Sequence, residues 1–209
     1  MQLNKIFILC IFLVFISSCG KSKNIEIMFE DGFLYSSQNQ IISELKKSNS
    51  KQEIKNTLVS QDWIKDFKIN FRIDGNVKIY IFSKIPLFVW NDAFYVDKNI
   101  NTFKFDETEH NLISVFCPSN QIEDAKKLVE YLNNLQLETK FSFIKLDFKY
   151  SSGWTLFSEN NITIKFGKDI SSTRLNSFKQ SLNYVYENKS IPSMIDLRYK
   201  DGVALNYGK

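Results

Sequence analysis

The side chains that most often perform catalysis are sparse in this sequence and form no recognised catalytic pattern. His110 is the only histidine, and it lies in the polar stretch Glu107-Thr-Glu-His-Asn111, which is typical of a solvated loop. Cys117 follows it, but nucleophilic catalysis also needs a third group that orients the base, and no residue suggests one. The sequence has no glycine-rich phosphate loop, no G-x-S-x-G elbow and no H-E-x-x-H motif. We therefore expect a protein that is not an enzyme.

A metal or cofactor site is not predicted either. Closely spaced acidic residues are interpreted as loop and helix-start charges rather than as acid–base pairs; these are Glu107 and Glu109, and Glu123 and Asp124. The three cysteines, Cys10, Cys19 and Cys117, lack the spacing of zinc ligands. Cys117 stands alone after the N-terminal segment. We therefore expect no disulfide there and predict that Cys117 is a small buried hydrophobic residue.

The composition indicates a folded chain without a nucleic-acid partner. Of the 209 residues, 44% are hydrophobic and 15% aromatic, and only 7 Gly and 3 Pro occur, so a core can be filled. The formal net charge is +4, and basic residues are scattered among acidic ones, as in Lys51, Glu53 and Lys55. No tract of like charges resembles a nucleic-acid-binding arm.

An apolar N-terminal segment implies that the rest of the chain is exported. Residues 6–16 are all apolar, and Ser17-Ser18-Cys19-Gly20 follows them. As a helix they would span about 16 Å, well short of the roughly 30 Å hydrocarbon core of a bilayer. Such a segment fits a cleaved signal peptide, and Ile16-Ser-Ser-Cys19 also resembles a lipobox, which would place a lipid on Cys19. The third interpretation is a short uncleaved anchor, which local thinning of the bilayer tolerates.

The exported part begins with the pattern of a small α+β unit. A first strand is predicted at Ile25–Phe29, and capping boxes at Ser37–Gln40 and Ser50–Glu53 predict the starts of two helices. Residues 67–73 and 77–81 alternate between apolar and polar side chains on either side of Asp74-Gly75-Asn76, which predicts a β-hairpin. The predicted order over residues 24–84 is strand, helix, helix, strand, strand.

The remaining residues predict a mixed part in which strands alternate with two helices. One helix is predicted from about residue 121 to 135, with an apolar stripe along one side, and a second carries Leu175, Phe178, Leu182 and Val185. Strands are predicted at Leu87–Trp90, Phe94–Asp97, Asn101–Phe105, Phe143–Lys149, Trp154–Ser158, Ile162–Phe166, Met194–Tyr199 and Val203–Tyr207. Runs of strands with helices set against them indicate the α+β class.

Three segments resemble the FtsQ/DivIB family of bacterial cell division proteins. The most specific is Ile195-Asp-Leu-Arg-Tyr199-Lys-Asp-Gly202-Val-Ala-Leu-Asn-Tyr207, which is similar to the segment that closes the family's chains. The second runs from Gly153-Trp154 to Gly167-Lys168 and resembles a hairpin of the family, with Asn161 in place of the usual glycine. The third is Pro86-Leu-Phe-Val-Trp90. Further departures are Ser83 in place of a usual Glu, and Tyr207 in place of a terminal Trp.

The resemblance implies three parts. They are a membrane anchor or signal segment at 1–22, a POTRA module with the order βααββ at 23–85, and a mixed α/β domain with an extended sheet at 86–209. It further implies a single-pass protein of the bacterial inner membrane, held through residues 6–19, with its bulk on the periplasmic side. The alternative is a POTRA-bearing envelope lipoprotein anchored at Cys19, which would assist membrane protein assembly or transport.

The resemblance also implies a scaffold that links early and late cell division proteins. In this family the FtsB/FtsL pair binds, and FtsB adds a strand to the open edge of the last strand, a mode that sheet edges favour. Further divisome proteins would bind the POTRA module. The expected partner-binding residues are Arg198, Tyr199, Gly202, Val203, Ala204, Leu205, Asn206 and Tyr207. We expect Arg198 to pair with a partner carboxylate and Gly202 to be needed for the turn.

Overall fold

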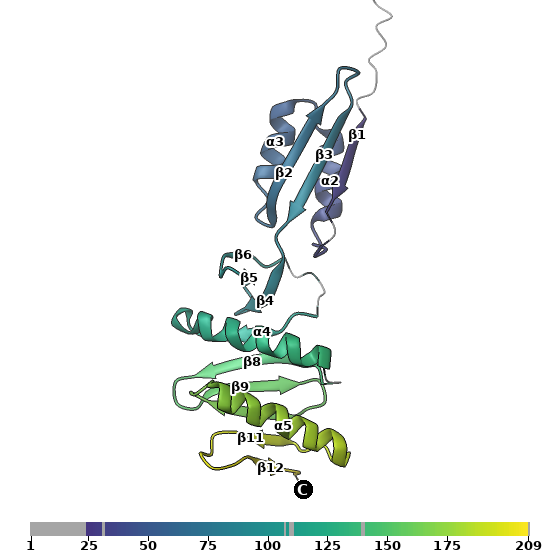
Figure 1. Ribbon diagram of the computed structural model, residues 1–209. Coiled ribbons are helices and arrows are strands. Elements are labelled where there is room, and N and C mark those ends of the chain that lie inside the picture. Colours follow the sequence, from purple (N-terminus) through teal and green to yellow (C-terminus); the bar gives the residue numbers. More distant parts are fainter. Residues whose placement is uncertain (1–23, 31, 107, 109–110, 139–140, 209) are drawn as a thin grey trace, which may run out of the picture.

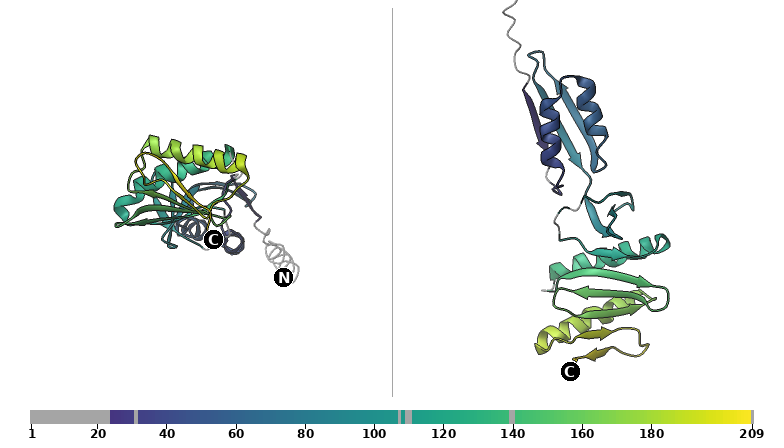
Figure 2. Two further views of the ribbon diagram at one scale, coloured as in Figure 1. Left: turned by 90° about the horizontal axis from the view of Figure 1, so that it is seen from below. Right: turned by 180° about the vertical axis from the view of Figure 1, so that it is seen from behind.

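The structure is a computed structural model that describes residues 24–30, 32–106, 108, 111–138 and 141–208, with only the backbone of 136–138. Within these residues the strands form one sheet of three strands and one of nine. The two sheets follow one another along an elongated molecule, with the small sheet at one end and the last strand at the other (Figures 1 and 2). The predicted α+β class with a large sheet is confirmed.

The small sheet is built from the N-terminal residues in the predicted order. Its elements are β1 (Ile25–Phe29), α2 (Gln38–Lys47), α3 (Lys51–Val59), β2 (Ile64–Phe71) and β3 (Val77–Ser83). Strand β3 lies in the middle, parallel to β1 and antiparallel to β2. Both helices cover one face, which is turned toward the viewer in the right panel of Figure 2. The predicted first strand and hairpin are confirmed.

Only one of the two predicted capping boxes forms. At the start of α3, Ser50 Oγ accepts a hydrogen bond from Glu53 N–H at 3.1 Å, and the Glu53 carboxylate accepts one from Ser50 N–H at 3.3 Å. At the start of α2, Ser37 makes no capping bond, so the box predicted at Ser37–Gln40 is wrong. Ser37 has helical backbone angles (φ −74°, ψ −9°) rather than the extended ones of a capping residue. Gln40 donates to Glu44 at 2.8 Å instead.

The large sheet contains all the remaining strands of the described residues, in the order β12-β11-β10-β9-β8-β7-β4-β5-β6. Their bounds are β4 (Pro86–Trp90), β5 (Phe94–Asp97), β6 (Thr102–Lys104), β7 (Ser114–Phe116), β8 (Phe143–Lys149), β9 (Gly153–Ser158), β10 (Thr163–Gly167), β11 (Met194–Asp196) and β12 (Ala204–Asn206). Its helices are the short 3₁₀ helix η1 (Ser119–Gln121), α4 (Ile122–Glu138) and α5 (Ser172–Asn188). The sequence predicted every one of these strands except β7.

Both long helices lie on the same face of the large sheet. Helix α4 connects the parallel strands β7 and β8, and α5 connects the parallel strands β10 and β11. Each connection leads to the neighbouring strand on the β12 side of the sheet. The strands from which they start, β7 and β10, run in the same direction. Because such crossovers are almost always right-handed, they place their helices on one face, as Figure 1 shows.

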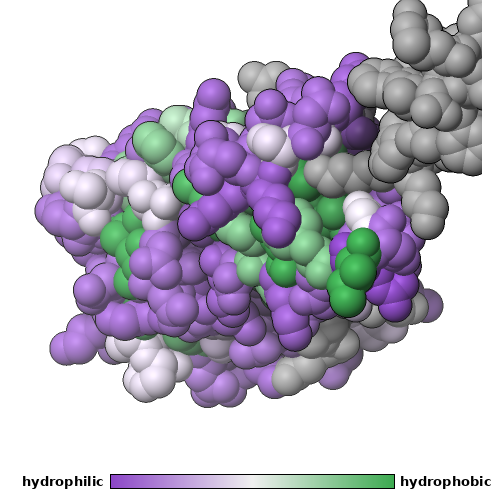
Figure 3. Space-filling model, turned by 90° about the horizontal axis from the view of Figure 1, so that it is seen from above, coloured by the Kyte–Doolittle hydropathy of each residue, from purple (hydrophilic) through white to green (hydrophobic). Residues whose placement is uncertain are grey.

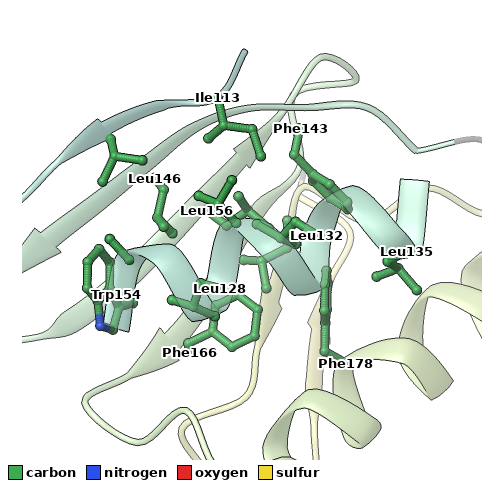
Figure 4. Close-up of a cluster of buried hydrophobic side chains, with 14 of the residues drawn as sticks. Ile113, Leu128, Leu132, Leu135, Phe143, Leu146, Trp154, Leu156, Phe166 and Phe178 are labelled. Atoms are coloured by element: carbon green, nitrogen blue, oxygen red, sulfur yellow. The ribbon is translucent and has the colours of Figure 1, made fainter. Parts of the chain in front are cut away.

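The predicted apolar stripe of α4 fills the main core. Five of its residues have exposed fractions of 0–3%, namely Ala125, Leu128, Val129, Leu132 and Leu135, and Ile122, which the stripe also includes, is partly buried. Figure 4 shows Leu128 and Leu132 between the sheet residues Leu156 and Phe166 and the α5 residue Phe178. The rings of Phe166 and Phe178 meet edge to face with their centroids 5.1 Å apart. This packing fixes α4 and α5 on the sheet.

An aromatic cluster joins the two sheets across Pro86. Val89, Tyr95 and Phe103 of the large sheet belong to the same buried cluster as the core of the small sheet. At its centre the Tyr35 ring stacks on Trp63, with centroids 4.9 Å apart, and the Tyr35 hydroxyl donates to a backbone oxygen of the strand connection, Lys84 O, at 2.6 Å. This cluster therefore takes residues from both sheets, while the rest of the large sheet has a core cluster of its own, and the domain boundary near residue 86 stays a prediction.

The structure tests several single-residue predictions. Cys117 is buried, as predicted, and the structure also places Trp63 and Trp154 in the core. His110 and the N-terminal segment 1–22 lie outside the described residues. Within the described part of the chain, no helix has both the length and the apolar character that a membrane crossing requires.

Candidate functional site

Strand β12 forms one edge of the large sheet. It is a strand of 3 residues, Ala204–Asn206, and it pairs antiparallel with β11 on one side. No other strand of the described residues pairs with its second side. An unpaired strand side presents free N–H and C=O groups, which can receive a strand of another chain.

The hydrogen bonds of β11 determine which way each of its residues faces. Leu197 N–H, one residue after β11, donates to Lys165 O of β10 at 2.9 Å. The N–H and C=O groups of successive strand residues point to alternate sides, so Ile195 and Leu197 face β10. Met194 and Asp196 therefore face β12.

It follows that the backbone of Leu205 points to the open side. Asn206 and Ala204 lie opposite Met194 and Asp196, and they face β11. Asn206 O indeed accepts a hydrogen bond from Ser193 N–H at 2.8 Å, which confirms its inward direction. Leu205 lies between them, so its N–H and C=O point away from β11. The site thus offers one donor and one acceptor at the centre of the edge.

The side chains of this edge divide between core and solvent. Leu205 and Val203 are partly buried and pack against the main core, whereas Ala204 and Asn206 are exposed. Tyr199 and Tyr207 flank the edge with exposed fractions of 61% and 46%. Exposed tyrosines provide large rigid contact surfaces, which are typical of protein interfaces.

Arg198 is already paired within the chain. Its Nε donates to Asp196 Oδ1 at 2.8 Å and its Nη2 to Asp196 Oδ2 at 2.6 Å, and its backbone N–H donates to Oδ1 at 3.1 Å. The hydrogen bonds from Arg198 hold the pKa of Asp196 below its ordinary value. The Arg198 side chain is 44% exposed and that of Asp196 only 5%. A carboxylate of a partner could therefore bind only to an Arg198 guanidinium that already neutralises the buried Asp196.

A polar cavity of about 360 Å³ adjoins this ion pair at the start of α5. Arg174 and Arg198 line it, together with Ser171, Asp169 and Val203. Arg174 donates to Phe166 O at 2.7 Å and lies 3.4 Å from an Asp169 oxygen, which holds its guanidinium in place. The cavity lies on the same surface as β12, since Tyr199 and Gly202 also line it.

The steric role expected of Gly202 is not supported. Its φ is not positive, and a Cβ atom there would meet nothing within 4 Å. The glycines that are sterically required lie elsewhere. Gly153 has a φ of +77°, and an added Cβ would lie 2.0 Å from the backbone of Gly167. Asn161 adopts a φ of +59° at the turn where the sequence departs from the glycine of the resembled hairpin.

The described residues contain no group of three side chains that could hold a metal ion. Burial raises the pKa of Cys117 to about 11, so its thiol stays protonated at neutral pH and makes a poor nucleophile. The β12 edge itself offers backbone hydrogen-bonding groups and exposed tyrosines, which are features of a binding surface. Sequence reasoning missed Asp196, although its place two residues before Arg198 in an apolar strand is a signal for a buried ion pair.

Comparison with known proteins identifies the family. The sequence profile described as "Cell division protein FtsQ/DivIB, C-terminal" matches residues 88–198, so β12 lies just beyond the matched part. The chain is also similar to proteins named Cell division protein FtsQ, with 23% identity to that of Neisseria meningitidis over 69% of this chain and 62% of the relative. For the Escherichia coli protein the identity is 21%, over 69% of this chain and 55% of the relative. The matched part spans less than two thirds of these relatives' lengths. The chain belongs to the FtsQ/DivIB family of cell division proteins.

Proposed function

We propose that this chain is a non-enzymatic scaffold that links early and late cell division proteins by receiving a strand of FtsB, as part of the FtsB/FtsL pair, on β12. The observation that carries the proposal is the outward direction of the Leu205 backbone at an edge with which no second described strand pairs. An incoming strand would pair with the groups that β12 leaves free.

The side chains around this edge support the same proposal. Leu205 packs against the core, so the strand is held from one face while its edge stays open. Tyr199 and Tyr207 offer exposed aromatic surface on either side of it. A pairing of only a few residues gives little affinity by itself, so the flanking tyrosines would supply much of the remainder.

The remaining parts of the chain fit the same scaffold. Residues 23–85 would act as a POTRA module whose order of elements is βααββ, and would contact further divisome proteins. Residues 6–19 would anchor the chain in the inner membrane, with the described part on the periplasmic side. The lipobox-like Ile16-Ser-Ser-Cys19 keeps the second candidate, an envelope lipoprotein, open. Mass spectrometry of the native protein distinguishes them, because a mature N-terminus at an acylated Cys19 excludes the transmembrane anchor.

The test of strand addition is a proline at the open donor. Leu205→Pro removes an N–H that makes no bond to β11, so the sheet should stay intact while the incoming strand loses its central partner. Leu205→Val is the matched control, since it keeps the N–H and an apolar side chain. Binding of the FtsB/FtsL periplasmic segment from the same organism to the full chain would be measured by calorimetric titration.

We expect Leu205→Val to bind like the natural chain and Leu205→Pro to lose binding while its circular dichroism spectrum and melting temperature are retained. Full affinity in a folded Leu205→Pro variant would show that the partner binds elsewhere, and strand addition at β12 would be abandoned.

A further inference from the structure

The turn between β2 and β3 lies at the end of the molecule where the described chain begins. Val77 N–H donates to Asn24 O at 2.9 Å, so the first described residue lies beside the end of this turn. Figure 1 shows the hairpin projecting beyond the helices at the end of the molecule where β1 begins. The hairpin tip, residues 71–76, thus lies beside Asn24, where the described chain begins.

The hairpin tip carries apolar side chains that the fold does not use. Ile73 is fully exposed and Phe71 is 39% exposed. The turn itself is well ordered by hydrogen bonds, since Arg72 N–H donates to Asn76 O at 2.9 Å and Gly75 N–H to Arg72 O at 3.1 Å. A closed turn therefore holds an isoleucine in solvent, where a polar residue would serve the turn equally well. Figure 3, which looks down on this end of the molecule, shows apolar surface exposed there among hydrophilic residues.

Basic side chains surround these apolar ones. The Lys51 ammonium lies 4.5 Å from the centre of the Phe71 ring, and Arg72 is exposed between Phe71 and Ile73. Helix α2 ends at the same end of the unit, with Lys46 and Lys47 in its last turn.

The acidic side chains at this end are already engaged within the chain. Asp74 accepts hydrogen bonds from Asn76, and Glu53 accepts those of its capping box. Glu26 pairs with Lys78 at 2.7 Å. Asp74 and Glu53 keep their negative charge, because their hydrogen bonds come from uncharged groups, but the basic side chains Lys46, Lys47, Lys51 and Arg72 outnumber them. The hairpin tip therefore combines apolar groups with a modest excess of basic charge, a combination that suits an anionic lipid surface.

Few residues separate the proposed anchor from Asn24, and this limits how far the hairpin tip can lie from the membrane. Asn24 is eight residues after Ile16, the end of the apolar run, and five after Cys19. Fully extended, these stretches reach at most about 29 Å and about 18 Å. Whether the chain is held by a helix or by a lipid on Cys19, the hairpin tip cannot move far from the bilayer.

From this geometry we propose that the hairpin tip rests on the membrane that anchors the chain. Ile73 enters the interfacial layer, and Arg72 and Lys51 bind the phosphates of anionic phospholipids. The contact orients the elongated molecule so that β12, at the opposite end, faces away from the bilayer (Figure 1). The inference goes beyond the proposed scaffold function, and it rests on the anchoring that this proposal includes.

The experiment uses the full chain in liposomes of phosphatidylethanolamine and phosphatidylglycerol. A photo-reactive benzoylphenylalanine is placed at position 73 and, as a matched control, at position 59. Val59 is also exposed, at 64%, but it ends the helix that begins at Lys51, so it lies away from the hairpin tip. Lipid adducts are measured by mass spectrometry after irradiation, and flotation reports whether the chain is bound to the liposomes.

If the hairpin tip enters the interface, position 73 should yield about tenfold more lipid adduct than position 59. The yield at position 73 should fall several-fold when phosphatidylglycerol is replaced by phosphatidylcholine, or in Lys51→Gln/Arg72→Gln. Equal yields at 73 and 59 in liposomes that carry the chain overturn the membrane contact and leave the anchor standing. A chain that does not float with the liposomes overturns the anchor, and this inference with it. In native membranes, adducts at position 73 that contain only protein also overturn it.

Discussion

Arg198 donates hydrogen bonds of 2.8 and 2.6 Å to the two carboxylate oxygens of Asp196, immediately beside the open edge strand β12. The acid is almost wholly buried, whereas the guanidinium remains 44% exposed. The arginine that the sequence nominates for a partner thus also keeps an internal charge neutralised. Its replacement will therefore change the stability of the C-terminal strands as well as any binding.

We expect Arg198→Met to lower the free energy of unfolding by about 1–3 kcal/mol at neutral pH, because it leaves a buried carboxylate without its main partner. The value lies below that for a fully buried pair, because water reaches Arg198. Arg198→Lys should lose less, since it keeps the charge but not the two-point geometry. Denaturant titration measures all three chains, and an unchanged stability in Arg198→Met would mean that the pair contributes nothing.

The Arg198–Asp196 pair should make the free energy of unfolding depend on pH. The folded chain holds the pKa of Asp196 below its unfolded value of about 3.9, so the pair stabilises the folded state above that pH. The stabilisation is lost as the pH falls through the folded pKa. The difference in unfolding free energy between the natural chain and Arg198→Met should therefore be largest near pH 7 and shrink below about pH 4. A difference that grows on acidification would contradict this assignment.

The exposed tyrosines should contribute to binding without contributing to the fold. Tyr199→Ala or Tyr207→Ala should weaken the binding of the FtsB/FtsL segment by about 1–2 kcal/mol, the range of an aromatic interface residue. Tyr150→Ala is a matched control, because Tyr150 is 64% exposed in the turn between β8 and β9. Titration calorimetry with the full chain checks the effect. Natural affinity in the double variant Tyr199→Ala/Tyr207→Ala would place the binding surface elsewhere.

Replacement by alanine should change the stability strongly at Gly153 and hardly at all at Gly202. Gly153→Ala should destabilise the chain by more than about 2 kcal/mol, because its φ is +77° and the new Cβ would collide with Gly167. Gly202→Ala places its Cβ in open space and should change stability by no more than about 0.5 kcal/mol. Thermal melting of the two variants measures the contrast. Similar losses in both would contradict the geometry of the β9–β10 pair.

The two serines before the N-terminal helices should also differ. Ser50→Ala removes the hydrogen bond that Glu53 N–H donates to the Ser50 hydroxyl at the start of α3, and should cost about 1 kcal/mol. Ser37→Ala removes a buried hydroxyl without a partner among the described residues, so we expect no loss or a slight gain in stability. Urea denaturation of both variants decides the matter, and equal losses would mean that Ser37 caps α2 in solution.

The local elements were largely predictable because their signals lie within short stretches. The alternation around Asp74-Gly75 specified the β2–β3 hairpin, and the apolar stripe of α4 specified its buried side. The capping boxes show the limit of such signals. Ser37 and Ser50 begin the same motif, yet only Ser50 has the extended backbone that the cap requires. The path of the preceding loop decides that angle, and the motif does not encode it.

The sequence by itself determined the class of the fold, its order of elements and its resemblance to a family, because propensity, periodicity and motif order are properties of neighbouring residues. Only the tertiary structure decided that β12 lies at a sheet edge and that the Leu205 backbone faces outward. It alone joined Asp196 to Arg198 and carried the aromatic core across Pro86. Strand order and hydrogen-bond direction depend on pairing between residues far apart in the chain. No local pattern can specify such pairing, because it is selected by the packing of the whole sheet against its helices.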